Sequence, residues 1–396
     1  MRSEIEAIVA SLDTLERSED VNEAYAIVDR WNRESRTRDL LDLADAIEAG
    51  CKVEGAARVS YEAVADHVEE VLALTAGEGH VDALFTLLSK ERVRSVQRPR
   101  PLELRVRSFA SRLGHGQTKE ALIAAISRAG GHAAASEHTE VLACWMHETV
   151  LRGTALDREE VALAFHAALA KKNHPLGLLP LALLGAESEA PTYMPMYGAN
   201  AISKAVQRLE NGSPSTRTMP PPGEQKSPTA TAVPDGALEK RLLEAVVPWT
   251  SGSKGAAEAK VFRLEPSIGT SAPGKWLLRA LPLACLEGAN ALHAERTGSE
   301  AVWGALFAAA ANGGAYTSGL GGAYGRRAAW TSLAALVDAP ASATPAQVDE
   351  HAGASAFLMF GARDGWWNDV AWDIGALAVR DGGDSVAVLA ATDTTD

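Results

Sequence analysis

The sequence predicts an α-rich protein of two domains: an all-helical N-terminal half and an α+β C-terminal module with a small, mainly antiparallel sheet. Apolar residues recur with helical spacing over residues 1–210, and short alternating apolar segments appear only near the C-terminus. Between them, residues 211–236 are rich in Pro, Ser, Thr and Gly and offer no apolar face. We therefore expect a helical domain at 1–210, a flexible linker at 211–236 and an α+β domain at 237–396.

The N-terminal half consists of short helical patterns joined by brief turns. Ile5, Ile8 and Leu12 share one helical face, and Ser3-x-x-Glu6 reads as a capping box, as does Asp157-x-x-Glu160 later. Helix pairs recur at a loose spacing of about 35–45 residues, which is typical of helical repeats. No fixed repeat signature accompanies this spacing, so an irregular solenoid is favoured over a multi-helix bundle. Further helices are expected near residues 21–31, 40–47, 64–74, 81–88, 101–113, 117–129, 136–152, 157–171, 175–185 and 193–209.

The C-terminal part combines helices with strands. Alternation predicts strands at 260–264, 356–360, 370–379 and 385–391. The last two flank Asp381-Gly382-Gly383-Asp384, a sequence typical of a hairpin turn. A helix over 366–379 is the alternative, because apolar residues there also fit one helical face, but the turn favours strands. Helices are expected at 237–247 (stopped by Pro248), 274–287, 298–311 and 323–337, with a further short one starting at Thr344.

Composition and charge limit the functional classes. The chain is 46% hydrophobic and 22% charged, which is typical of a soluble globular protein, and it carries a net charge of −13. An acidic chain is a poor general binder of nucleic acid. No apolar run approaches the roughly 20 residues that span a bilayer. The first six residues enter an acidic amphipathic pattern rather than a signal peptide, so we expect a cytoplasmic protein.

A glycine-rich connector, residues 312–327, joins two predicted helices. Glycines allow positive φ or close backbone approach, so tight helix packing is the favoured interpretation. The alternative is a phosphate cradle of backbone N–H groups aided by the arginines, although neither nucleotide-binding motif has its required context. The candidate ligand-binding residues are Gly313, Gly314, Tyr316, Gly321, Gly322, Tyr324, Arg326 and Arg327.

Two further features suggest protein interfaces. Trp366 and Trp367 are adjacent, and in an extended segment both cannot point inward, so one of them is a candidate interface anchor. A basic strip that includes Arg94, Arg98 and Arg100 follows a strongly acidic N-terminal region. Without interleaved aromatic residues, pairing with acidic groups of this chain or of a protein partner is favoured over nucleic-acid binding.

Residue patterns typical of catalysis are missing from the sequence. Cys51, Cys144 and Cys285 are too far apart for a metal knuckle, and the histidines lack metal-ligand spacing. The aspartates between 364 and 384 match no metal-loop template. We predict no catalytic residue, no metal and no cofactor.

Four segments carry a resemblance to other proteins: AAANGGAY (309–316), GLGGAYGR (319–326), VAWDIG (370–375) and AVLAATD (387–393). They resemble an uncharacterised family of two-domain proteins from high-GC soil bacteria, most closely over residues 240–396. The resemblance supports the domain division and implies no activity, cofactor or catalytic residue. We expect a non-enzymatic bacterial interaction or scaffold protein, with a helical protein-binding half and an α+β recognition module. The alternative is an enzyme or sensor that binds a phosphorylated small molecule at residues 312–327.

Overall fold

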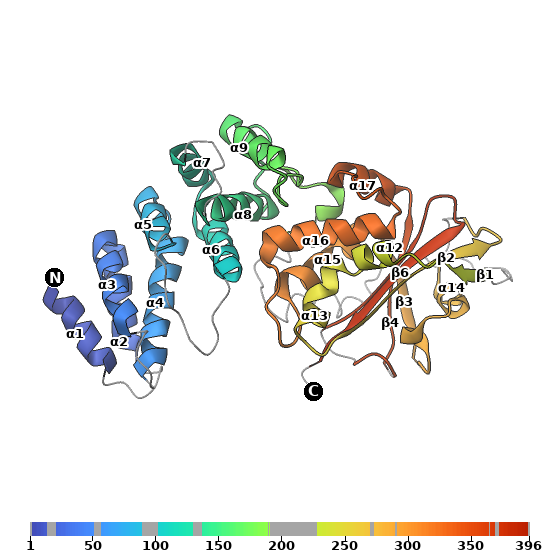
Figure 1. The fold of residues 1–396 in the computed structure, drawn as a ribbon, viewed down its shortest axis with the longest axis horizontal. Coiled ribbons are helices and arrows are strands. Elements are labelled where there is room, and N and C mark those ends of the chain that lie inside the picture. Colours follow the sequence, from blue (N-terminus) through green and yellow to red (C-terminus); the bar gives the residue numbers. More distant parts are fainter. Residues whose placement is uncertain are drawn as a thin grey trace. The chain divides into compact units, whose positions relative to one another are not determined.

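A computed structural model describes most of the chain: residues 2–13, 21–50, 57–88, 102–129, 137–188, 190, 228–269, 273–289, 291–363, 365–368 and 372–394. The chain divides into two compact units (Figure 1). The first comprises Met1–Val150 with Leu156–Gly177, and the second comprises Leu151–Ala155 with Leu178–Asp396. The first is helical and the second contains all the described strands, so the predicted α-rich, two-part architecture is confirmed.

The first unit is a two-row array of helices. One row is formed by α1, α3, α5, α7 and α9, each packed on the next odd-numbered helix, while α2 packs on α4 and α4 on α6 in the other row. This pattern, in which helices other than α8 contact their second neighbours, is that of a helical solenoid. The bounds are α1 Arg2–Asp13, α2 Asn22–Arg33, α3 Thr37–Gly50, α4 Ala57–Leu74, α5 Glu78–Leu88, α6 Leu102–Gly116, α7 Lys119–Arg128, α8 Glu137–Leu151 and α9 Glu160–Lys171.

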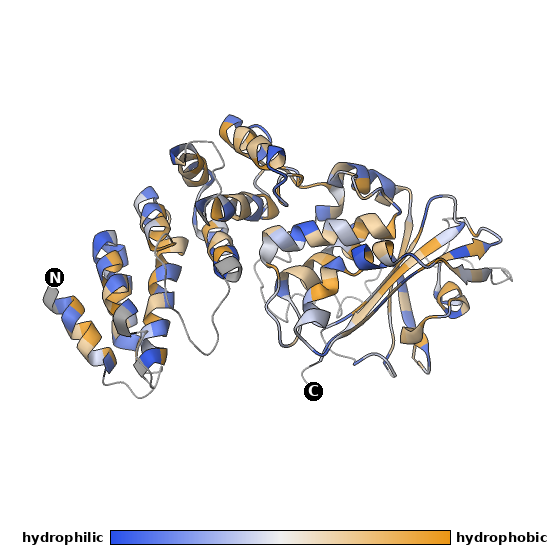
Figure 2. Cartoon of the chain, viewed as in Figure 1, coloured by the Kyte–Doolittle hydropathy of each residue, from blue (hydrophilic) through white to orange (hydrophobic). Residues whose placement is uncertain are grey.

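Amphipathic faces and polar side chains hold the rows together. Figure 2 shows the helices banded by hydropathy, and in α2 the buried residues are Ala24, Val28 and Trp31, at the spacing of one helical face. Next to that face, Asn32 Nδ2 donates to Thr75 Oγ1 over 2.9 Å. Gln117 Nε2 donates to the Thr75 carbonyl oxygen over 2.6 Å. The turn between α4 and α5 is therefore fixed by side chains from both neighbouring repeats.

Several local predictions for the N-terminal half are wrong. Ser3 lies inside α1, and α9 begins after Glu159, whose side chain makes no capping hydrogen bond. Residues 175–185 form turns and bends, which lead to the short 3₁₀ helix η2 (Gly185–Glu187). Pro175 and Pro180 explain this, because proline removes a backbone donor and clashes with the preceding turn of a helix. The helix predicted at 193–209 lies outside the described residues.

The second unit is built on a six-stranded sheet with the order β1-β2-β6-β5-β4-β3, in which every neighbouring pair is antiparallel. The predicted hairpin is present, with Gly382 and Gly383 at φ +83° and +67° between β5 and β6. A helix over 366–379 is wrong, because 373–379 is strand β5. The strands are β1 Thr229–Ala232, β2 Ala256–Glu265, β3 His293–Thr297, β4 Ala356–Gly361, β5 Asp373–Val379 and β6 Ser385–Thr392.

Strand β1 corrects the predicted linker at its C-terminal end. Thr229–Ala232 pair with 262–265 of β2, and Asp235 accepts the N–H groups of Ala237 and Leu238 at the start of the next helix. Residues 228–236 thus belong to the folded second unit, because their backbone groups extend the sheet and cap a helix. Residues 211–227 lie outside the described part of the chain.

The sheet is covered on both faces. Phe262, Leu358, Phe360, Leu377 and Val388 share one core cluster with α14 and η4. Because side chains alternate along a strand, the buried residues between them face the other layer, where α15 packs on β4 and α16 on β6. The helices are α12 Gly236–Leu242, η3 Glu244–Val246, α13 Val247–Ser251, α14 Lys275–Ala280, η4 Ala284–Leu286, α15 Ser299–Asn312, α16 Gly321–Leu336 and α17 Pro345–Gly353.

Two of the predicted helices in this unit are broken. The helix expected at 237–247 divides into α12 and η3, and Pro248 lies in the first turn of α13 instead of ending a helix. The helix expected at 274–287 ends at Ala280, shortly before Pro282, and the chain turns before η4. This break shapes the surface described below.

Candidate functional site

The glycine-rich connector between α15 and α16 is closely packed. Gly313 has φ +83°, and a Cβ atom there would overlap the carbonyl oxygen of Thr317. A Cβ atom at Gly319 would overlap the carbonyl oxygen of Ala311. Within α16, a Cβ atom on Gly325 would lie 2.9 Å from Ala311 Cα. These glycines therefore let the connector fold back on the end of α15 and let α16 approach α15.

A carboxylate of the chain itself lies against the connector. Asp393 is fully buried, and its Oδ2 accepts the Ala315 N–H over 2.7 Å. Its Oδ1 accepts the Ser253 hydroxyl, also over 2.7 Å. A Cβ atom at Gly314 would overlap Asp393 Oδ2. The place where the sequence suggested an external phosphate is therefore occupied by an internal anion.

Arg326 is fully buried and makes an internal ion pair. Its Nε donates to Glu187 Oε1 over 2.5 Å, and its Nη2 donates to Glu187 Oε2 over 2.8 Å. Nη1 and Nη2 also donate to the carbonyl oxygens of Pro180 and Ala182. Glu187 is buried too, and accepts the Trp330 indole N–H over 2.7 Å. Arg326, a candidate anion ligand in the sequence, instead joins η2 to α16.

The other candidate residues of the connector are dispersed. Tyr316 is 57% exposed, whereas Tyr324 is half-buried and Gly322 is buried. Gly321 has φ +73° where α16 begins. Arg327 Nη1 lies 3.6 Å from Glu244 Oε1. The side chains of Arg326 and Arg327 thus lie against different carboxylates and do not converge on one site.

Trp366 and Trp367 do not point to opposite sides of a strand, as the sequence predicted. Trp367 is buried, and its indole N–H donates to the Cys285 carbonyl oxygen over 2.7 Å. Trp366 is half-buried, with its ring centroid 5.0 Å from that of Trp367. Residues 365 and 366 form a turn and 367 and 368 are irregular, so the segment is not a strand and adjacency does not force the two rings to opposite sides. Trp367 is thus a core residue, and Trp366 keeps part of its surface exposed.

Of the basic strip, Arg94, Arg98 and Arg100 lie outside the described residues. The strip stays a prediction.

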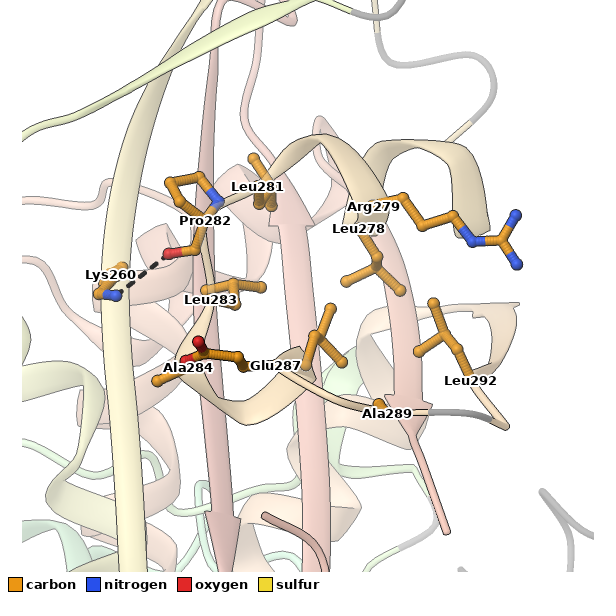
Figure 3. Close-up of a pocket in the computed structure, with 11 residues that line it drawn as sticks. Lys260, Leu278, Arg279, Leu281, Pro282, Leu283, Ala284, Glu287, Ala289 and Leu292 are labelled. Atoms are coloured by element: carbon orange, nitrogen blue, oxygen red, sulfur yellow. Dashed lines mark hydrogen bonds between the residues drawn. The ribbon is translucent and has the colours of Figure 1, made fainter. Parts of the chain in front are cut away.

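A pocket of about 580 Å³ opens beside the strand β2 (Figure 3). We call it the leucine pocket. Its polar lining residues are Lys260 at one end, Arg279 at the opposite end and Glu287. Its apolar side chains include Leu278, Leu281, Leu283, Leu286 and Leu292. The pocket exists because the chain leaves α14 at Ala280, shortly before Pro282, and loops back over the sheet.

Hydrogen bonds from behind hold the wall of the leucine pocket. Glu258 Oε1 accepts the Ala284 N–H over 2.9 Å, and Oε2 accepts the Cys285 N–H over 2.7 Å. Lys260 Nζ donates to the Pro282 carbonyl oxygen over 3.2 Å. Burial alone would raise the pKa of Glu258, but the hydrogen bonds from Lys260 and from these N–H groups outweigh it and lower that pKa.

The cysteine thiols nearby and in the first unit are poorly suited to nucleophilic chemistry. Burial raises the pKa of the Cys285 thiol, and the charge of Glu258 raises it further. Burial raises the pKa of Cys144 in the same way, with Glu140 and Glu148 adding to the effect. A thiol with a raised pKa stays protonated at neutral pH and is a weak nucleophile. Among the described residues, no group of three His, Cys, Asp or Glu side chains could hold a metal ion.

Fold and site together define the class: a helical solenoid followed by an α+β unit whose sheet carries a leucine-lined pocket. The chain belongs to the family of unknown function DUF6183, whose model matches residues 22–395. The match spans both units, so the family is defined by their combination. No curated protein and no solved structure matched the chain. Within the described residues, no helix is long and apolar enough to cross a membrane.

Proposed function

We propose that this protein is a non-enzymatic interaction protein, in which the helical solenoid binds a protein partner and the α+β unit is a recognition module. The two-row packing of α1 to α9 carries the proposal, because stacked helical repeats present long surfaces that such proteins use for binding. The internal use of Arg326 and of the Ala315 N–H argues against the alternative, a phosphorylated small molecule at residues 312–327.

One surface of the solenoid has the chemistry of a binding site. Helices α2 and α4 are neighbours in the same row. The Tyr25 ring lies 4.3 Å from the His67 ring, and His67 Nε2 lies 2.8 Å from Asp29 Oδ1. Partial burial raises the pKa of Tyr25, and the nearby charges of Asp66 and Glu70 raise it further. An aromatic ring among carboxylates suits a lysine- or arginine-rich segment of a partner.

Affinity capture with matched charge reversals tests this proposal. The full-length chain, its Asp66→Lys/Glu70→Lys variant and a control Asp157→Lys/Glu160→Lys variant are immobilised and exposed to lysate of the source bacterium. We expect the wild type and the control to retain a common basic partner that the first variant loses, with capture weakening as salt rises. Equal capture by all three proteins, or no specific capture by the wild type, contradicts the proposed surface.

The basic strip supplies a second test. Because we assign Arg94, Arg98 and Arg100 to protein contacts, we expect no salt-sensitive binding of duplex or single-stranded nucleic acid by the intact chain. Electrophoretic mobility shifts that disappear when these three residues are changed to Glu would assign the strip to nucleic acid instead.

A further inference from the structure

The leucine pocket is lined by leucine side chains together with polar surface, and two of its charged residues, Lys260 and Arg279, lie at opposite ends. Leu278, Leu281 and Leu283 are buried side chains at its base, while Leu286 and Leu292 are partly exposed. Its volume of about 580 Å³ lies within the range of roughly 300–1,000 Å³ that small-molecule sites occupy. None of its lining residues, in the described chain, contributes a buried side-chain polar atom without a partner. No buried polar side chain of the lining therefore needs a ligand as its hydrogen-bond partner.

The two ends of the pocket differ in charge. Lys260 Nζ lies 2.7 Å from Glu258 Oε1, and Glu287 extends on the same side of the pocket (Figure 3). The Lys260 end is thus compensated by carboxylates. Arg279 lies at the other end, in the last turn of α14, and is exposed. It makes no ion pair with any residue that the structure describes, so this end presents an exposed cation that could pair with an anionic ligand.

The pocket is formed before a ligand arrives. Four hydrogen bonds, from the Ala284 and Cys285 N–H groups, Lys260 and Trp367, fix residues 282–285 against the sheet. A fixed apolar wall lowers the ordering cost of binding a flexible apolar chain.

We propose that the leucine pocket binds a single-chain amphipathic carboxylate, with its alkyl chain on the leucine side chains and its carboxylate paired with Arg279. The charge at the Arg279 end favours an anion, and the five leucine side chains offer contacts to an alkyl chain. This site is separate from the protein-binding surface proposed for the solenoid and does not depend on it.

Titration of the full-length protein with dodecanoate, below its critical micelle concentration, tests the proposal by calorimetry. We expect saturable binding, and weaker binding of dodecanol and of acetate, which lack the charge and the chain respectively. Arg279→Ala should weaken dodecanoate binding roughly threefold, as expected for an exposed ion pair, and Arg279→Glu more than tenfold. The control Lys275→Ala removes an exposed cation from the same helix and should leave the affinity unchanged.

Further variants and ligands separate the pocket from unspecific association. Ala289→Trp, which places a large side chain in the pocket, should abolish binding while circular dichroism shows an unchanged fold. Equal affinity for dodecanol and dodecanoate, an unaffected Ala289→Trp variant, or no binding by the wild type overturns the proposal. Phosphatidylglycerol vesicles distinguish a membrane source: binding to vesicles without binding of free dodecanoate also overturns it.

Discussion

Two segments of the second unit use their polar groups in opposite ways. In the connector, residues 312–327, two polar groups that could have bound an anion are used internally: the Ala315 N–H binds Asp393 and the Arg326 guanidinium binds Glu187. In the wall of the leucine pocket, backbone N–H groups donate to Glu258 and the Trp367 indole donates to a backbone carbonyl. These bonds hold the backbone from behind and leave leucines and Arg279 around an open space. Glycine content therefore marks dense packing here, while the cavity is formed by ordinary aliphatic residues.

The largest expected effect distinguishes the two adjacent arginines of the connector. Arg326→Met leaves the buried Glu187 carboxylate without its cation, which should lower the free energy of unfolding by about 3–5 kcal/mol. The control Arg327→Met changes a side chain that is 40% exposed and should cost less than about 0.5 kcal/mol. Urea unfolding followed by tryptophan fluorescence measures both. The double variant Glu187→Leu/Arg326→Met should recover part of the loss; equal costs for the two arginines would contradict an internal role for Arg326.

A second comparison concerns two helical glycines. Gly325→Ala places a methyl group 2.8–2.9 Å from atoms of Ala311, which is closer than packed atoms allow, so α16 must move away from α15. We expect a loss of about 1–3 kcal/mol. Gly353→Ala, at the end of α17, meets no atom within 4 Å and should be neutral within about 0.5 kcal/mol. If the two variants melt at the same temperature, the helices are not in close contact at Gly325.

The sequence predicted regular elements better than the contacts between them. Strands β4, β5 and β6 alternate strongly and the last two flank a glycine turn, whereas β1 consists of small residues and β3 carries Glu295 and Arg296, so neither edge strand shows an apolar pattern. Arg326 and Arg327 look alike in the sequence. Arg326 is buried because it pairs with Glu187, which lies 139 residues earlier in the sequence. The helix predicted over 274–287 includes four of the five pocket leucines, and the break near Pro282 that opens the cavity depends on tertiary contacts.

Loss of a contact in the wall of the leucine pocket should lower the free energy of unfolding less than loss of the Arg326 ion pair in the connector. Glu258→Gln removes a negative charge that accepts two backbone N–H groups, so we expect a loss of about 1–3 kcal/mol and weaker dodecanoate binding. Glu265→Gln is the control, because it lies exposed at the end of the same strand. The pKa of Glu258 is lowered in the folded protein, so its contribution is present above the unfolded value of 4.5 and is lost as pH falls below it. Urea unfolding at pH 7 and pH 4 should show a larger loss in the wild type than in Glu258→Gln, because the other carboxylates titrate in both proteins.

The smallest expected effect on stability concerns His80 of the solenoid. It occurs at a higher pH than the effect of Glu258. His80 is buried at the start of α5, where its Nε2 lies 2.9 Å from Asn32 Oδ1, and burial lowers its pKa below 6.5. The unfolded chain therefore takes up a proton first as pH falls, so the stability of the first unit should decrease below about pH 6.5, by at most about 1.4 kcal/mol per pH unit. Melting curves from pH 8 to pH 5.5 should show this slope in the wild type and a smaller one in His80→Gln. An NMR titration that gives His80 a pKa above 6.5 would contradict the assignment, because a histidine stabilised in its charged form would make the solenoid more stable, not less, at low pH.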